Sequence, residues 1–254
     1  MMRFKVISVS GILIVLAIWS FVTYGGLVGN LFLPTPTAVV LEARKQIAEG
    51  VFFTDIWVSF YRILIGFLLA TLFALPIGVM MGTSKTWKAF WEPLVGFVRY
   101  MPVVAFIPLS ILWFGTSDMQ KFFIIFFGVF FQQVIMIADN CKTVKKSVLE
   151  VGLTLGLNRF EVIKDIVVKA AMPNIWDTMR TVWGWAWTYL VVAELVAATS
   201  GLGFRIMQAQ RYLSTETIIL GILTIGILGL ITDIIFGLLA KCMFPWNEKE
   251  KINN

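Results

Sequence analysis

Long stretches without a charged side chain constrain this chain more than any other feature. Residues 63–82 contain no Asp, Glu, Lys or Arg, and no charge occurs from Val6 to Leu41. A helix needs about 20 apolar residues to cross the hydrocarbon core of a bilayer. Hydrophobic residues make up 59% of the 254 residues and charged residues 14%, whereas about a quarter of a soluble domain is charged. We therefore predict an all-α membrane protein.

Apolar stretches recur between charged segments and predict six transmembrane helices in one domain, residues 1–254. The spans are expected at about 6–24, 60–82, 90–114, 122–139, 181–198 and 217–243. The first has no small-x-small cleavage site, which favours a retained helix over a signal peptide. Pro34 and Pro36 block its continuation, and Thr37 is expected to cap the next helix. Gly78 and Gly82 form a GxxxG pair, which indicates close helix packing.

The predicted third span contains Arg99 and three prolines, Pro93, Pro102 and Pro108, which are expected to break its helix. Broken helices are tolerated at membrane depth where the freed backbone lines a cavity. A charge within the membrane is costly and usually functional. We therefore consider Arg99, Pro102, Pro108 and Glu194 of the fifth span as candidates for a translocation path. Alternatively, Arg99 reaches the cytoplasmic headgroups or pairs with Glu92 or Glu194.

The longest charged insert, residues 141–176, predicts two short helices joined at a turn. Residues 155–158 interrupt the helical pattern, and Gly156 can adopt a positive φ there. From Arg159 to Ala171 apolar residues recur at helical spacing, which gives one apolar face. Asp165 and Lys169 stand in the favourable i,i+4 order on the other face. An amphipathic loop lying on lipid is the simpler interpretation.

The distribution of basic residues predicts the orientation. With six spans, both termini lie on one side. That side holds fourteen of the 21 Lys and Arg residues, the other side holds five, and Arg62 and Arg99 lie within spans. The positive-inside rule places both termini and residues 141–176 in the cytoplasm. Cys141 and Cys242 also lie on this reducing side, so no disulfide is expected.

Composition and motifs exclude several function classes. The excess of basic residues is explained by membrane topology, so we expect no nucleic-acid partner. The chain has no phosphate-binding G-x4-G-K-[ST] loop, so it is not expected to bind ATP. It has no His and two Cys, which excludes a zinc site and Ser-His or Cys-His catalysis. A proton-coupled secondary transporter remains an alternative, with Glu194 and Asp233 as its relay.

The charged insert resembles the EAA loop of binding-protein-dependent ABC importer permeases, whose pattern is E-A-A-x3-G-x9-I-x-L-P. Glu150, Gly156 and Ile166 match its spacing. The departures are Val151 and Gly152 in place of the alanines, Val168 in place of Leu and Lys169 in place of Pro. Pro173 matches a second proline that is common in the nitrate/sulfonate/taurine/bicarbonate branch.

Four further segments are similar to this branch: Leu33-Pro34-x-Pro36, Ser59-x2-Arg62-x3-Gly66-Phe67, Ile107-Pro108-Leu109-x2-Leu112-Trp113-Phe114-Gly115 and Ala193-Glu194-x5-Ser200-Gly201-Leu202-Gly203. The resemblance implies a type I ABC importer permease fold in the bacterial inner membrane. It implies a homodimer, or a heterodimer with a second permease, that binds two ABC ATPase subunits and an extracytoplasmic substrate-binding protein. ATP and Mg²⁺ would bind to the ATPase, and no cofactor is expected in this chain.

The resemblance also implies roles for the charged insert. It would form the coupling helices that dock into the ATPase, with Phe160 and Ile163 as apolar contacts and Arg159 and Glu161 as a polar rim. Packing of Phe160 within the insert itself is the alternative. Glu150 is expected to stabilise the insert. The cargo would be a small oxyanion or sulfonate, with Arg99 and Arg62 as positive groups; relatives that carry thiamine-precursor pyrimidines look much the same.

Overall fold

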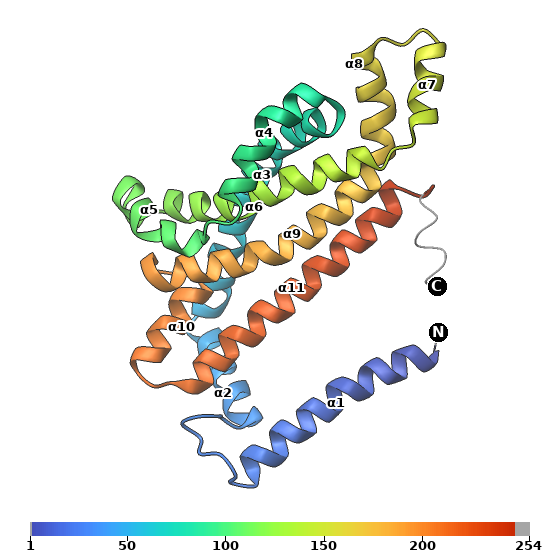
Figure 1. Cartoon of the computed structure of the whole chain (residues 1–254). Coiled ribbons are helices and arrows are strands. Elements are labelled where there is room, and N and C mark those ends of the chain that lie inside the picture. The colour runs from blue at the N-terminus through green and yellow to red at the C-terminus, as the bar shows by residue number, and fades with distance from the viewer. Residues whose placement is uncertain (1, 247–254) are drawn as a thin grey trace.

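The fold is known from a computed structural model that describes residues 2–246, with the backbone alone for residues 2–9 and 146. Every regular element within that range is helical (Figure 1), so the predicted all-α fold is confirmed. In chain order the elements are α1 (Met2–Tyr24), α2 (Pro36–Ala48), α3 (Val51–Thr83), α4 (Lys85–Val98), the 3₁₀ turn η1 (Val103–Phe106), α5 (Ile107–Phe114), α6 (Asp118–Lys142), α7 (Lys146–Thr154), α8 (Arg159–Glu161), the π-helical η2 (Val162–Val167), α9 (Val168–Ala197), α10 (Leu202–Arg211) and α11 (Thr215–Met243).

The core lies where α3, α6 and α9 pack together. Glycines permit the close approach of α3 to α6. A Cβ atom on Gly78 would lie 2.7 Å from Ile137 Cβ, and one on Gly82 would lie 2.6 Å from the Ala138 carbonyl oxygen. Trp183 of α9 packs against the same core. The predicted packing role of the GxxxG pair is therefore confirmed, because larger side chains would push the two helices apart.

Among the described residues, three helices, α3, α6 and α11, are long and apolar enough to cross a membrane. Two bent helix pairs also qualify, which gives up to five spans by length and composition: residues 85–114, bent by 83°, and residues 159–211, bent by 48°. Residues 10–24 of α1 form a shorter apolar helix. The count of six spans stays a prediction.

Several boundaries differ from the prediction. Helix α3 begins at Val51 rather than Phe60. Thr35, not Thr37, caps α2, because its hydroxyl accepts a hydrogen bond from the Ala38 N–H at 3.3 Å. The helix that begins at Arg159 continues through η2 and α9 to Ala197 rather than ending at Ala171. The charge at Arg180 does not interrupt α9, because its guanidinium pairs with Asp233 of α11 at 2.5 Å.

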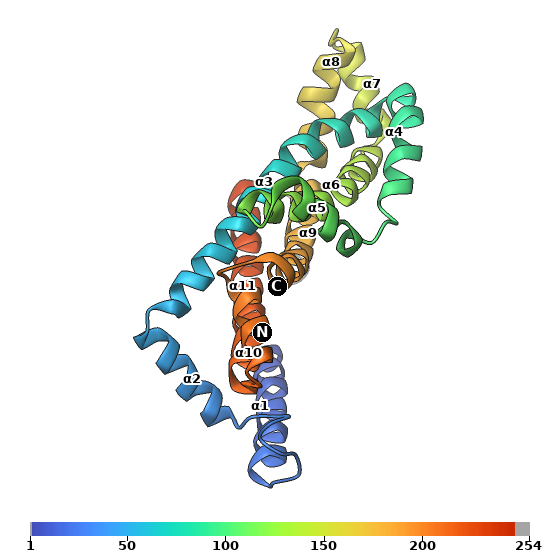
Figure 2. The same ribbon diagram turned by 90° about the vertical axis from the view of Figure 1, so that its left-hand side faces the viewer.

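The third predicted span is two helices with a sharp bend between them. Pro93 lies inside α4 and Pro108 lies in the first turn of α5, where proline is tolerated. Pro102 alone lies at the break, which it borders as the residue before η1. Figure 2 shows the resulting turn of the chain between α4 and α5. The expectation that all three prolines break this span was wrong.

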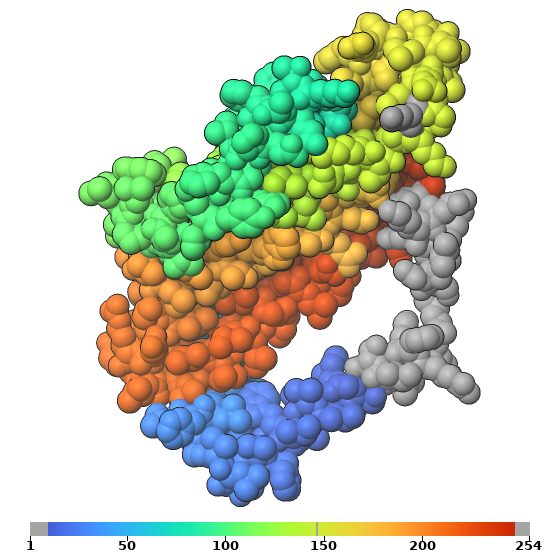
Figure 3. Space-filling model, viewed as in Figure 1, coloured from blue at the N-terminus to red at the C-terminus, as the bar shows by residue number. Residues whose placement is uncertain are grey.

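The two ends of the molecule are formed by different elements. The hairpin of α7 and α8 projects at one end, and the α1–α2 and α10–α11 connections lie at the other (Figure 1). Helix α1 stands away from α11 over most of its length in the space-filling view (Figure 3). Helix α9 runs between the two ends, with its first turns joined to the hairpin and its last turn beside α10.

Candidate functional site

The hairpin turn has the backbone that its sequence predicts. Gly156 adopts φ +84°, and the Leu157 N–H donates to the Gly152 carbonyl oxygen at 3.2 Å. Asn158 then caps the second helix: its Oδ1 accepts from the Glu161 N–H at 3.0 Å, and its own N–H donates to Glu161 Oε2 at 2.8 Å. This reciprocal capping box fixes the turn. Glu161, predicted to form a polar rim, therefore also holds the helix start.

The apolar residues of the hairpin divide into a packed set and an exposed set. Ile166 lies against Gly152, where a Cβ atom would come within 2.3 Å of its side chain. Ile163 is half-buried, whereas Phe160 is 72% exposed and does not pack within the hairpin. Large apolar side chains exposed on a rigid element are typical of partner surfaces. The exposed set is Val148, Val151, Leu153, Leu155 and Phe160.

The charged face of the hairpin is solvated. Glu150 and Arg159 are exposed. Lys169 Nζ lies 2.8 Å from Asp165 Oδ1, so the predicted i,i+4 pair is formed. The hydrogen bond from Lys169 lowers the pKa of the Asp165 carboxyl below its ordinary value of 3.8. The pair therefore stays ionised at neutral pH.

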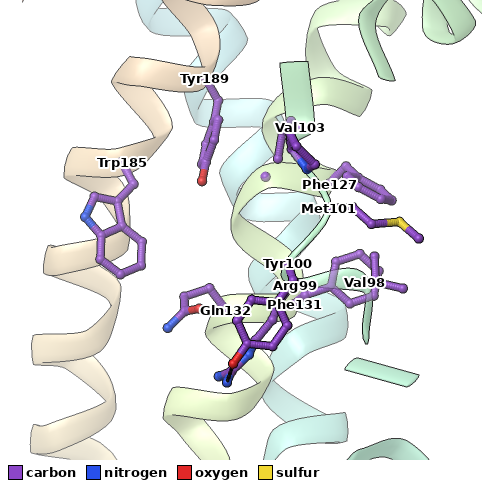
Figure 4. Close-up of a pocket in the computed structure, with 12 residues that line it drawn as sticks. Val98, Arg99, Tyr100, Met101, Val103, Phe127, Phe131, Gln132, Trp185 and Tyr189 are labelled. Atoms are coloured by element: carbon purple, nitrogen blue, oxygen red, sulfur yellow. Dashed lines mark hydrogen bonds between the residues drawn. The ribbon is translucent and has the colours of Figure 1, made fainter. Parts of the chain in front are cut away.

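A pocket of about 400 Å³ lies where the α4–α5 connection faces α6 and α9. Arg99 and Pro102 line it from the connection, Gln132 and Phe127 from α6, and Trp185 and Tyr189 from α9 (Figure 4). Pro108 and Glu194 are not among the lining residues. The structure thus places two of the four predicted path residues in one pocket and the other two elsewhere.

Arg99 is the one charged side chain among the described residues that line this pocket. It is exposed, its Nη2 donates to the Tyr100 hydroxyl at 2.7 Å, and its guanidinium carbon lies 4.7 Å from the centre of that ring. Glu92 lies 3.5 Å from Lys88, and Glu194 is paired with Arg62. Neither acid predicted as an alternative partner neutralises Arg99, so its positive charge faces the pocket.

A second polar group, buried except at Asp118 and part of Arg205, lies at the end of α9 far from the hairpin and was not predicted as a unit. We call it the Arg62 network; it comprises Asp55, Ser59, Arg62, Asp118, Lys121, Glu194, Arg205 and the backbone of residues 197–203. Arg62 is 4% exposed and Glu194 is 1% exposed. Arg62 Nη1 lies 2.8 Å from Glu194 Oε1, and Arg62 Nη2 lies 2.7 Å from Asp118 Oδ1. Arg62 is therefore enclosed between two carboxylates, whereas the resemblance had implied that it is a positive group available to cargo.

Two of the sequence segments quoted above meet in this network. Ser59 and Arg62 belong to one, and Glu194 and residues 200–203 belong to the other. The charges that sequence inspection missed, Asp55, Asp118, Lys121 and Arg205, flank predicted spans. Their positions beside span ends could have suggested topology but not pairing. Glu194 and Asp233, the proposed proton relay, are each bound to an arginine.

Residues 74–244 match the family described as "Binding-protein-dependent transport system inner membrane component". The chain belongs to this family. It is 34% identical over 235 residues to the putative aliphatic sulfonates transport permease protein SsuC of Bacillus subtilis, covering 92% of this chain and 85% of that one. It is 30% identical to the taurine transport system permease protein TauC of Escherichia coli, covering 95% and 90%. The nitrate import permease protein NrtB of Leptolyngbya laminosa is 26% identical, covering 79% and 72%.

The fold of this importer permease is also found in a solved structure. The chain superimposes on an inward-facing conformation of the MetNI methionine ABC transporter with a TM-score of 0.68 and 12% identity, covering 78% of this chain and 98% of that one. The type I importer permease fold is therefore confirmed. The permease is the transmembrane subunit of an ATP-driven importer, and membership of the family implies ATPase and binding-protein partners.

Proposed function

We propose that the permease forms a homodimer in the bacterial inner membrane and imports a small anion, an oxyanion or a sulfonate. The observation that carries the proposal is the pocket whose single charge is the guanidinium of Arg99. Both termini face the cytoplasm in this proposal, ATP and Mg²⁺ bind to separate ATPase subunits, and an extracytoplasmic binding protein delivers the cargo. The names of the relatives, which specify sulfonates, taurine and nitrate, support an anion.

The lining of the pocket suits an anion that passes through without tight binding. Arg99 supplies one positive charge, Gln132 and Tyr189 supply hydrogen-bonding groups, and Trp185 supplies an apolar wall (Figure 4). Arg99 is exposed and hydrated, so its attraction for an anion is weak, as release requires. No carboxylate occurs among the described residues that line the pocket. An ammonium group on the cargo, as in taurine, would find no countercharge there.

The hairpin of α7 and α8 docks on the ATPase in this proposal. Phe160 inserts into the partner, with Ile163 behind it and Arg159 at the rim. The helix from Arg159 to Ala197 is continuous, so a displacement of the hairpin moves the Trp185 and Tyr189 wall of the pocket as a rigid body.

Uptake measurements on Arg99→Gln test the anion path. The permease, reconstituted into vesicles with its ATPase and binding protein, should lose most ATP-dependent uptake of labelled sulfonate or nitrate. Co-purification of the ATPase should be unchanged. Arg211→Gln, an exposed arginine at the end of α10, is the matched control and should transport normally. Unchanged uptake by Arg99→Gln, or loss of assembly before any loss of uptake, would contradict the proposal.

Two further measurements distinguish the alternatives. A thiamine-precursor pyrimidine that competes with uptake when anions do not would replace the anion as cargo. Uptake driven by a proton gradient in vesicles without the ATPase would indicate a secondary transporter.

A reporter that is active outside the cytoplasm, fused to Asn254, should give no signal if the proposed orientation is correct.

A further inference from the structure

The Arg62 network connects helices that are far apart in the sequence. Three carboxylates, Asp55, Asp118 and Glu194, balance three cations, Arg62, Lys121 and Arg205. Arg205 Nη2 lies 2.8 Å from Asp55 Oδ2, which joins α10 to α3. Arg62 joins α3 to α6 through Asp118 and to α9 through Glu194. One balanced cluster therefore links α3, α6, α9 and α10.

The start of α10 is held entirely by side chains from other helices. The Gly201 N–H donates to Asp55 Oδ1 at 2.9 Å, and the Leu202 N–H donates to Ser59 Oγ at 2.9 Å. The Gly203 N–H donates to Glu194 Oε2 at 2.8 Å. The first N–H groups of a helix have no partner within the helix. Here three consecutive N–H groups are bound by α3 and α9, which fixes the entry of the chain into α10.

The glycines of this turn allow the approach. Gly201 adopts φ +110°, and a Cβ atom there would lie 2.3 Å from Glu194 Oε1. A Cβ atom on Gly203 would lie 2.7 Å from Glu194 Cβ. A side chain at either position would therefore collide with Glu194 and open the network.

Lys121 closes the other side of the network. Its side chain is fully buried, and Nζ donates to the carbonyl oxygens of Thr116 at 2.6 Å, Ser117 at 3.2 Å and Ala197. Ala197 is the last residue of α9, where unpaired carbonyl groups favour a cation. Lys121 thus ties the end of α9 to the turn that precedes α6. Gln120 extends this link to α5, because its Nε2 donates to Ser110 Oγ at 3.0 Å.

The ends of α6 and α9 that the network holds are only a few residues from the pocket-lining residues of the same helices. Tyr189 precedes Glu194 by five residues on α9, and Phe127 follows Lys121 by six residues on α6. The third wall of the pocket, residues 98–103, has no hydrogen bond to the network among the described contacts. Arg99 and Tyr100 in that wall are exposed and bond to each other.

We propose that the Arg62 network holds the α6 and α9 walls of the pocket as one rigid unit, which moves relative to residues 98–103 during transport. Arg62 and Glu194 are then positioning residues that never touch the cargo. Buried ion pairs contribute little net stability compared with apolar residues of the same size, whereas they can specify a single arrangement. This inference rests on the proposed function of the pocket as a path.

The first experiment removes one charge from the network. In Glu194→Gln the amide oxygen can still accept from Gly203, but the ion pair with Arg62 is lost. The reconstituted complex should assemble and hydrolyse ATP, while anion uptake per ATP hydrolysed falls about tenfold. Asp233→Asn is the matched control, since Asp233 is also paired with an arginine in a predicted span but lies outside the network. Its uptake per ATP should be unchanged.

Two outcomes for Glu194→Gln would overturn the proposal. Uptake and ATP hydrolysis that fall together, in proportion to the amount of assembled complex, would show that the network only supports folding. Unchanged uptake per ATP would show that the pair is dispensable. If Glu194→Gln fails to assemble, the double variant Arg62→Met with Glu194→Met removes both charges and preserves apolar packing. Normal uptake per ATP by that assembled variant would overturn the proposal, and reduced uptake per ATP would support it.

A second experiment tests rigidity directly. In a background without Cys141 and Cys242, one cysteine pair, Met119→Cys with Val196→Cys, is introduced at exposed positions of α6 and α9 next to network residues and is joined by a flexible bifunctional reagent. The other, Tyr100→Cys with Trp185→Cys, is introduced on two walls of the pocket and is joined by the same reagent. Cross-linking the first pair should leave uptake unchanged, and cross-linking the second should abolish it; loss of uptake in the first would overturn the inference. Uptake by the complex without cysteine pairs checks the proposed function separately.

Discussion

The burial of charged and apolar side chains differs between the two ends of the helix that runs from Arg159 to Ala197. At the hairpin end the charged residues are solvated and Phe160 is exposed. At the other end Glu194 and Lys121 are buried, and their charged groups contact groups of the same chain. The difference indicates which end is complete within one subunit and which end requires a partner.

The energetic reasons for the two arrangements differ. Removing ions from water costs several kcal/mol per ion, which pairing and hydrogen bonds must offset. The Arg62 network satisfies this requirement with ligands from four helices. An exposed aromatic side chain, by contrast, gains its stabilisation when a partner excludes water from it. The hairpin therefore presents the exposed apolar surface that the proposed docking requires, whereas the network preserves contacts within the chain.

The largest effect is expected from removal of the central cation. Arg62→Leu leaves Glu194 and Asp118 without their countercharge, and breaking a buried pair costs about 3–5 kcal/mol. The thermal midpoint of the detergent-purified permease should drop strongly, with less folded protein in the membrane. Arg44→Leu, at an exposed position of α2, should change stability by less than about 0.5 kcal/mol. Similar midpoints for the two variants would mean that the network is hydrated rather than buried.

A smaller effect, confined to assembly, is expected at the hairpin. Phe160→Ala removes an exposed aromatic ring, so folding of the isolated permease should be unaffected. If Phe160 is a central contact, ATPase affinity should fall by about 2 kcal/mol, or about 30-fold. Tyr212→Ala is the control, because Tyr212 is 77% exposed beyond α10. Equal ATPase binding by both variants would show that Phe160 contacts lipid instead.

The same contrast explains what the sequence could predict. The hairpin turn depends on neighbouring residues: Gly156 provides the positive φ, and Asp165 pairs four residues along the helix. Such local chemistry is visible in the order of the residues. Arg62 and Glu194 are 132 positions apart, so their pairing follows from packing, which the sequence does not display. Arg62 was therefore expected to be available to cargo, and Glu194 was assigned to the path or considered as a partner of Arg99.

The predictions of some helix boundaries were wrong for a related reason. The start of the fifth span was expected after Asp177 and Arg180, because charges normally end an apolar stretch. Asp233 on α11 pairs with Arg180, so the helix continues past it. The bend in the third span was expected from its prolines, yet only Pro102 lies where the backbone departs from a helix. The exposure of Arg99 and its isolation from Glu194 also depend on which helices pack together.

The backbone of the hairpin turn provides a third test. Gly156→Ala places a Cβ atom on a residue with φ +84°, which costs about 1–2 kcal/mol. Loss of the turn should weaken ATPase co-purification without reducing the amount of permease in the membrane. Gly50→Ala is the matched control, because Gly50 has φ +75° and equally open surroundings. Its backbone strain lies before α3, so ATPase binding should be retained; equal losses would indicate a general folding defect.

The smallest effect is expected where the hairpin has an ion pair of its own. Asp165 and Lys169 lie 2.8 Å apart, the same separation as Arg62 and Glu194, but in water rather than in the core. The hydrogen bond from Lys169 lowers the pKa of Asp165 below 3.8. A lowered carboxyl pKa stabilises the folded state above the ordinary pKa, and this contribution is lost only as the pH falls through the lowered value.

Solvent and salt screen an exposed pair, so Asp165→Asn should leave the thermal midpoint and ATPase binding of the permease unchanged at neutral pH. Both should also remain constant from neutral to mildly acidic pH in the parent protein. A large loss of ATPase binding by Asp165→Asn, with the midpoint unchanged, would place this carboxylate in the docking surface; a large drop in the midpoint would show that distance rather than burial determines the contribution of an ion pair.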